Sequence, residues 1–149
     1  MRNWLIVTDP INFVISAQRN FDMEGFQDIY EKTIKYKIAD GDQFLYYIKG
    51  YKKFAAITEA IPGGYFYSED IVWKSHTSNY IEKYPHRFRT KPICVLPEDR
   101  MLDAKDFAGH VKFLPFPKWG AGVRQSLKRI PQEEDFKKIK DAIIKRFNP

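Results

Sequence analysis

Few side chains in this sequence stand in a pattern that supports catalysis. The histidines, His76, His86 and His110, lie 10 and 24 residues apart, which is not a spacing typical of a metal site. Cys94 is the one cysteine and lies in an apolar run, where a buried, unreactive thiol is expected. The sequence holds no phosphate-cradling glycine loop, nucleophile elbow or zinc-protease motif. We therefore expect a protein that is not an enzyme and that needs no metal or cofactor.

One basic segment is better suited to binding than to chemistry. Residues 118–129 combine Trp119 with the cationic side chains Lys118, Arg124, Lys128 and Arg129. We expect a basic helix within residues 119–130, and a helix N-terminus beside Arg and Lys suits a phosphate group. The same pattern fits a helix that buries Trp119 in the core and keeps its cations in water. The two interpretations are compatible with each other.

Positive charge is unevenly distributed along the chain. The 25 basic and 19 acidic side chains give a net charge of +6. Residues 1–75 carry 9 basic and 10 acidic side chains, whereas residues 76–149 carry 16 and 9, a net charge of +7. A positive field in one half favours a polyanionic partner, although a solvated basic surface has the same composition. The aromatic content of 16% would supply surfaces on which bases can stack.

Short strands with helices near both ends must position these residues. We expect strands at 4–8, 43–48, 54–61 and 87–96, and helices at 10–20, 27–36 and from Pro131 onward, the last with a core stripe of Phe136, Ile139, Ile143 and Phe147. Pro62-Gly63-Gly64 is expected to end the third strand, and residues 65–84 to form a long excursion with a short helix. The 149 residues, without linker or repeat, predict a single domain over 1–149. Its expected class is α+β, a small, mostly antiparallel β-barrel flanked by helices. Without a signal peptide or a membrane-spanning run, the expected location is cytoplasmic.

Four stretches together resemble the EVE domain family of the PUA-like superfamily. They are residues 3–8, 41–47 and 84–93, and the stretch from Trp119 to Phe136. The resemblance covers nearly the whole chain and is strongest to small stand-alone archaeal and bacterial members. It implies a fold similar to PUA domains and to the YTH readers of methylated adenine. The implied role is non-catalytic binding of a modified base in DNA or RNA, flipped into an aromatic pocket.

The resemblance also implies where the pocket residues lie. The pocket would form at the end of the first strand, beside the segment that follows the first helix. The corresponding positions are Thr8, Asp9, Asn12, Phe21, Phe26 and Trp73, the last where related readers carry a second cage aromatic. The Asp9 carboxylate could accept a hydrogen bond from an exocyclic amine, or it could cap the helix that starts at Pro10.

One position departs from the family pattern. Many members carry a Trp-Gly pair after the first helix, and this chain has Glu24-Gly25. Phe21 or Phe26 would then have to supply the stacking face. An alternative function is therefore a small-molecule or protein-interaction module that keeps the fold without base binding. An enzyme that acts on nucleic acid is a third hypothesis. A pocket filled by Phe21 or Phe26, with no continuous basic rim, would favour the binding module.

Overall fold

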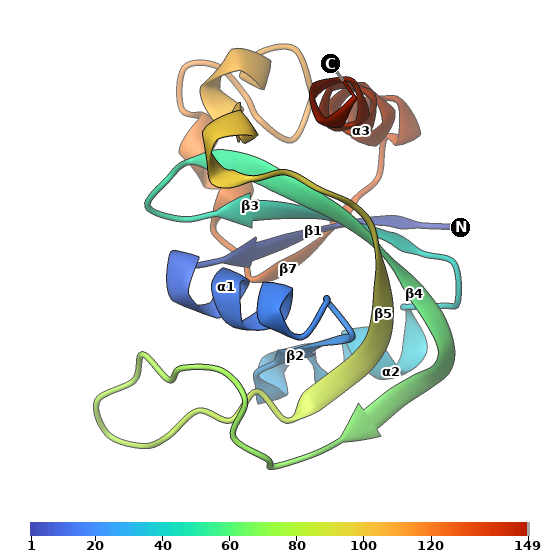
Figure 1. Ribbon diagram of the computed structural model, residues 1–149, viewed down its shortest axis with the longest axis vertical. Helices are drawn as coiled ribbons and strands as arrows, with labels where there is room; N and C mark the ends of the chain where they lie inside the picture. The colour runs from blue at the N-terminus through green and yellow to red at the C-terminus, as the bar shows by residue number, and fades with distance from the viewer. Residues whose placement is uncertain (149) are drawn as a thin grey trace.

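A strongly curled sheet forms the centre of the molecule (Figure 1). The computed structural model describes residues 1–148, and its sheet runs in the order β2-β5-β4-β3-β1-β7, with β6 paired to β4. The strands are β1 (Asn3–Thr8), β2 (Met23–Phe26), β3 (Gln43–Ile48), β4 (Lys53–Tyr67), β5 (His86–Val95), β6 (Leu102–Asp103) and β7 (Leu127–Ile130). Of these strand pairs, only β1–β3 is parallel. The predicted α+β class with a mostly antiparallel, barrel-like sheet is confirmed.

Within residues 1–148, three α-helices and four 3₁₀ turns surround this sheet. The α-helices are α1 (Pro10–Gln18), α2 (Glu31–Tyr36) and α3 (Glu133–Phe147); the 3₁₀ turns are η1 (Asp28–Tyr30), η2 (Glu98–Arg100), η3 (Ala104–Phe107) and η4 (Trp119–Val123). Asp9 caps α1 through its Oδ1, which accepts the Asn12 N–H at 2.9 Å. No helix in residues 1–148 is long and apolar enough to cross a bilayer.

The last helix buries most of its predicted stripe. Phe136, Ile139 and Ile143 are buried. Phe147 is 49% exposed, so its assignment to the core was wrong. As the final helical residue, it lies beyond the part of α3 that packs on the sheet.

The strand β4 does not end at Pro62-Gly63-Gly64, as the sequence predicted. It continues to Tyr67, and its register with β5 shifts between Ala60 and Tyr65. Gly63 and Gly64 have φ values of 133° and 62°, and all three residues of the break are exposed. A bulge at an exposed position accommodates proline and positive φ without ending the strand. Residues 68–85 contain no helix, so the short helix expected there was wrong.

Two other predicted helices are also incorrect in part. The expected helix at 27–36 divides into η1 and α2, and the four residues of β2 precede it. The expected basic helix within 119–130 is the five-residue η4 followed by the strand β7. The two glycines at 120 and 122 oppose a longer helix, and Leu127–Ile130 pairs with β1 instead.

Candidate functional site

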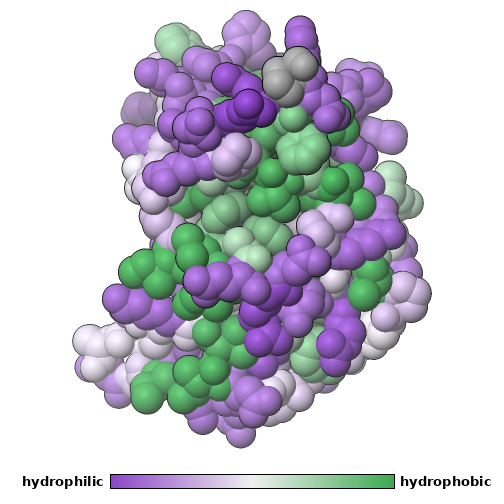
Figure 2. Space-filling view, in the orientation of Figure 1, coloured by the Kyte–Doolittle hydropathy of each residue, from purple (hydrophilic) through white to green (hydrophobic). Residues whose placement is uncertain are grey.

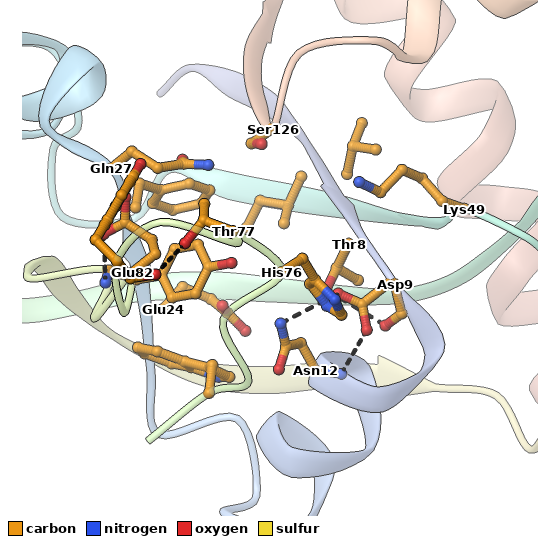
Figure 3. A pocket seen from close by; sticks show the side chains of 17 residues that line it. Thr8, Asp9, Asn12, Glu24, Gln27, Lys49, His76, Thr77, Glu82 and Ser126 are labelled. Atoms are coloured by element: carbon orange, nitrogen blue, oxygen red, sulfur yellow. Dashed lines mark hydrogen bonds and ion pairs between the residues drawn. The ribbon is translucent and has the colours of Figure 1, made fainter. Parts of the chain in front are cut away.

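A cavity of about 220 Å³ opens where β1 meets α1, beside β2 and the segment 68–85 (Figure 3). Pockets for drug-sized ligands measure roughly 300–1,000 Å³, so this space suits one small ring system. Its lining residues are Ile6, Val7, Thr8, Asp9, Asn12, Glu24, Gly25, Phe26, Gln27, Lys49, Trp73, His76, Thr77, Tyr80, Glu82, Tyr84 and Ser126. Figure 3 shows Glu24 and Gln27 on one side of the space, Asp9, Asn12 and His76 on another, and Lys49 and Ser126 beyond them.

The structure brings five of the six predicted pocket residues together. Thr8, Asp9, Asn12, Phe26 and Trp73 line the cavity. Phe21 does not line it and is 2% exposed. The ring of Phe21 packs in the core, 5.4 Å from the rings of both Phe13 and Tyr46. Its backbone has a φ of 50°, in the left-handed turn after α1, and this turn places Phe21 and Phe26 in different surroundings.

The Asp9 carboxylate is already engaged within the protein. Oδ1 accepts from the Asn12 backbone, and Oδ2 accepts from Asn12 Nδ2 at 3.1 Å and pairs with His76 Nε2 at 2.9 Å. Burial is the largest single influence and raises the pKa of Asp9, but these hydrogen bonds and the charge of His76 together hold it below its usual value. Asp9 therefore acts as a helix cap and anchors the segment 68–85 through His76.

Asn12 holds the same segment by a second contact. Its Nδ2 donates to the Lys74 carbonyl at 3.0 Å, and its Oδ1 accepts the Lys74 N–H at 2.7 Å. Because Nδ2 also donates to Asp9, the amide has little capacity left for a ligand. The role of Asn12 is to position the cavity wall.

The buried guanidinium of Arg87 also fixes this wall. Arg87 is 1% exposed, and it donates to the carbonyls of Asp70, Lys83 and Tyr84 at both ends of the segment. Its guanidinium carbon lies 5.1 Å from the centre of the Trp73 ring. Three carbonyl contacts and one ring contact thus tie the irregular segment to β5.

Trp73 lies deep in the wall and at 5% exposure forms part of the core as well as of the cavity. Its Nε1 donates to Ser16 Oγ at 3.0 Å, and its ring meets Tyr84 edge to face at 6.2 Å. A Cβ atom at Gly25 would lie 2.6 Å from Trp73 Cζ3 and still closer to the Tyr84 carbonyl oxygen. Only glycine therefore lets the indole rest against β2. Arg87 covers one side of the ring, and because the indole is only 5% exposed, a small part of it at most is left to contact a ligand.

Glu24, at the departure from the family pattern, is a buried carboxyl in the cavity wall. Its Oε1 accepts from Ser16 Oγ at 2.8 Å and from Tyr46 Oη at 2.9 Å. Burial raises the pKa of Glu24 to about 7, although the bonds from Ser16, Tyr46 and the Gly25 backbone lower it. The carboxyl therefore exchanges its proton near neutral pH.

Sequence reasoning missed most residues that segment 68–85 contributes. His76, Thr77, Tyr80, Glu82 and Tyr84 all line the cavity. The signal available was the length of the irregular stretch and its tyrosines, because long irregular segments in compact domains are often functional. Figure 2 shows hydrophobic residues at the surface over this segment, where Ile71 and Ile81 are 66% and 62% exposed.

A lysine-rich groove adjoins the cavity. Lys49, Lys52 and Lys118 line it together with the half-buried Trp119, and no acidic residue in the described part of the chain lines it. Lys49 lines both hollows. We call this hollow the lysine groove.

The predicted phosphate-binding cations do not share one helix N-terminus. Lys118 lies in the lysine groove, and Arg124 is exposed in the turn before β7. Lys128 and Arg129 follow each other on β7, and successive side chains on a strand point to opposite faces. These last two cations therefore do not form one site.

Comparison with known proteins identifies the family to which this chain belongs. The EVE domain model matches residues 2–142. A solved protein from Pseudomonas putida has a TM-score of 0.62 and 14% identity over 94% of this chain and 98% of its own. A hypothetical protein from Leishmania major has a TM-score of 0.64 and 14% identity over 98% of this chain and 96% of its own. The comparison with curated proteins gave no significant match.

A similar fold occurs in a domain solved with a methylated RNA. The YTH domain of the Zygosaccharomyces rouxii MRB1 protein, in complex with N6-methyladenosine RNA, has a TM-score of 0.62 and 16% identity, over 95% of this chain and 86% of its own. Identity at this level shows the fold alone, which is PUA- and YTH-like as the sequence predicted. With the family model spanning residues 2–142, the chain belongs to the EVE domain family.

Proposed function

We propose that this protein binds nucleic acid without catalysis and takes one modified base of a DNA or RNA strand into the cavity. The observation that carries the proposal is the junction of two hollows. A cavity sized for a single ring, with aromatic walls, adjoins a groove lined by three lysines. A base can enter the first while the adjacent phosphates contact the second.

The aromatic walls support stacking on a base. Phe26, Trp73, Tyr80 and Tyr84 line the cavity, and every base presents a π-face to such rings. Phe26 lines the space without filling it. In this proposal, rings from segment 68–85 take the place of the family tryptophan that this chain lacks.

The lysine groove supports contact with the strand backbone. Lys49 lies at the junction, and Lys52 and Lys118 extend the positive charge away from the cavity. A lysine ammonium group attracts a phosphate as a point charge, without the bidentate geometry of arginine. Lys118 keeps its proposed phosphate role, now as part of a groove rather than of a helix terminus.

The relatives give the proposal a precedent. A structure with the same fold is solved with N6-methyladenosine RNA, so the fold accommodates a strand with a modified base in that protein. For this chain the experiment is a titration of single-stranded oligonucleotides that carry one methylated or hydroxymethylated base, against unmodified strands. Tighter binding of a modified strand supports the proposal. The proposal is contradicted if all strands bind equally and weakly and if Tyr80→Ala does not change their affinity.

A second candidate is a pocket for a free small molecule. The observation in its favour is the composition of the cavity, since three carboxyl groups, of Asp9, Glu24 and Glu82, face it and only one lysine does. The rim of the cavity itself is therefore not continuously basic. One measurement separates the two functions. If the cavity is a pocket for a free small molecule, a free nucleoside binds as tightly as the oligonucleotide, and added salt does not weaken its binding.

A further inference from the structure

The carboxyl of Glu24 has no cationic partner in the described chain. The neutral donors Ser16 and Tyr46 both reach Oε1. Within residues 1–148, no side chain donates to Oε2. No lysine, arginine or histidine forms an ion pair with Glu24 within residues 1–148. A buried carboxylate without a counter-charge is costly, and a cation placed beside it would offset that cost.

The walls around Glu24 also favour positive charge. Phe26, Trp73, Tyr80 and Tyr84 line the cavity, and aromatic rings attract a cation that lies over their face. The Trp73 ring already holds one cation in this structure, the Arg87 guanidinium at 5.1 Å. Aromatic rings together with a carboxylate form the usual cage for organic cations.

The other charged groups of the cavity leave an excess of negative charge. Asp9 pairs with His76 at 2.9 Å, so that carboxylate is partly neutralised. Glu24 and Glu82 remain, against Lys49 at the junction with the lysine groove. Asp22, outside the cavity, lies near Glu24 but is paired with Arg19 at 3.0 Å and is left out of this balance. A neutral ring interacts with this field only through its dipole and its donors, whereas a cationic ring is attracted by a full charge–charge interaction.

We propose that the cavity selects a base whose ring carries a positive charge near neutral pH, as 3-methylcytosine and 1-methyladenine do, and that Glu24 is the residue that supplies the counter-charge. This inference rests on the base binding proposed above and names the class of base. It gives a function to the position where the family tryptophan is absent. The wall aromatics stack on the ring, and Glu24 pairs with its charge.

The test compares two isomeric bases that differ in charge. Three single-stranded oligonucleotides carry 3-methylcytosine, 5-methylcytosine or cytosine at the same position; near pH 7 only 3-methylcytosine is cationic. We expect the protein to bind the 3-methylcytosine strand at least about tenfold more tightly than the 5-methylcytosine strand. In Glu24→Gln, which keeps the acceptor for Ser16 and Tyr46, the preference falls to about one. Glu69→Gln removes the same charge outside the cavity and keeps the preference.

A second measurement needs no change at Glu24. Between pH 6 and pH 8 the preference for the 3-methylcytosine strand rises as Glu24 ionises, and it rises likewise in Glu69→Gln, whose carboxyl lies outside the cavity. The inference is overturned if the protein binds the 5-methylcytosine strand as tightly as the 3-methylcytosine strand, or more tightly. If it then still binds the 5-methylcytosine strand more tightly than the cytosine strand, base binding stands. Equal binding of all three strands overturns the inference and also excludes a methylated cytosine as the base that the cavity selects.

Discussion

Asn12 pairs with the backbone of Lys74 as a neighbouring strand would, donating to its carbonyl at 3.0 Å and accepting its N–H at 2.7 Å. The two residues are 62 positions apart in the chain. One amide side chain thus holds an irregular segment at the mouth of the cavity.

Removing this amide should loosen the segment. Asn12→Ala leaves the Lys74 N–H without its partner and the Lys74 carbonyl with only the 3.4 Å contact from the Tyr84 hydroxyl, and we expect a loss of about 1 kcal/mol in the free energy of unfolding. Amide hydrogen exchange within residues 68–85 should accelerate, while exchange in β3 stays slow. The same exchange rate for this segment in wild type and variant would show that Asn12 does not hold it.

Gly25 provides a direct test of the packing around Trp73. A methyl group at this position meets Trp73 Cζ3 at 2.6 Å and the Tyr84 backbone, so Gly25→Ala should cost about 1–3 kcal/mol of stability. Tryptophan fluorescence should change with it. Gly120→Ala is the matched control, because nothing lies within 4 Å of its Cβ position, and it should melt close to the wild type. Equal melting temperatures for the two variants would contradict the account.

The sequence predicted the elements with strong periodicity. The strand at 43–48 and the last helix follow a clear hydrophobic pattern, and both are confirmed within about two residues. The strand β2 was missed because Met-Glu-Gly-Phe has no alternation and little β propensity; its pairing with β5 forms it. The basic stretch 119–130 shows the opposite error, since its pairing with β1 overrides the expected helix.

The cavity residues likewise fall into some that the sequence predicted and some that depend on tertiary contacts. Family resemblance placed five of the lining residues at it: Thr8 and Phe26 end strands, Asp9 and Asn12 lie at the start of α1, and Trp73 lies in the irregular segment 68–85. The cap that Asp9 forms on α1 was one of the two roles predicted for it and is confirmed, but nothing in the sequence showed that His76 pairs with Asp9 or that Lys74 occupies Asn12. The tyrosines of segment 68–85 lie on backbone without periodicity, so only the tertiary contacts bring them to the cavity.

Stability should depend on the protonation of Glu24. Because the pKa of Glu24 rises from its ordinary value of 4.5 to about 7 in the fold, the folded state holds the proton more tightly than the unfolded state. The stability contributed by the protonated carboxyl is present below about pH 4.5 and is lost as the pH rises through about 7. The change is about 3 kcal/mol in this window.

Glu24→Gln should remove this dependence. Urea denaturation of both proteins at pH 5, 6, 7 and 8 measures it, and the variant should gain on the wild type as the pH increases. Parallel curves for the two proteins at all four values would show that the carboxyl has an ordinary pKa.

The lysine groove should determine how binding depends on salt. In Lys52→Ala and Lys118→Ala, the slope of log affinity against log salt should fall by about 1 for each phosphate contact removed. Lys145→Ala removes a cation from the last turn of α3 and should leave the slope unchanged. If all three variants lower the slope alike, the groove has no special role.

The central claim is that a modified base enters the cavity. The most direct measurement is the NMR chemical-shift change of this protein on addition of a single-stranded oligonucleotide with one modified base, compared with the same strand unmodified. The account predicts that the modified strand alone shifts the backbone amides of Thr8 and Gly25 and the Trp73 indole N–H, while both strands shift the amides around Lys52 and Lys118. Identical shifts from the two strands, with none at the cavity, would contradict it.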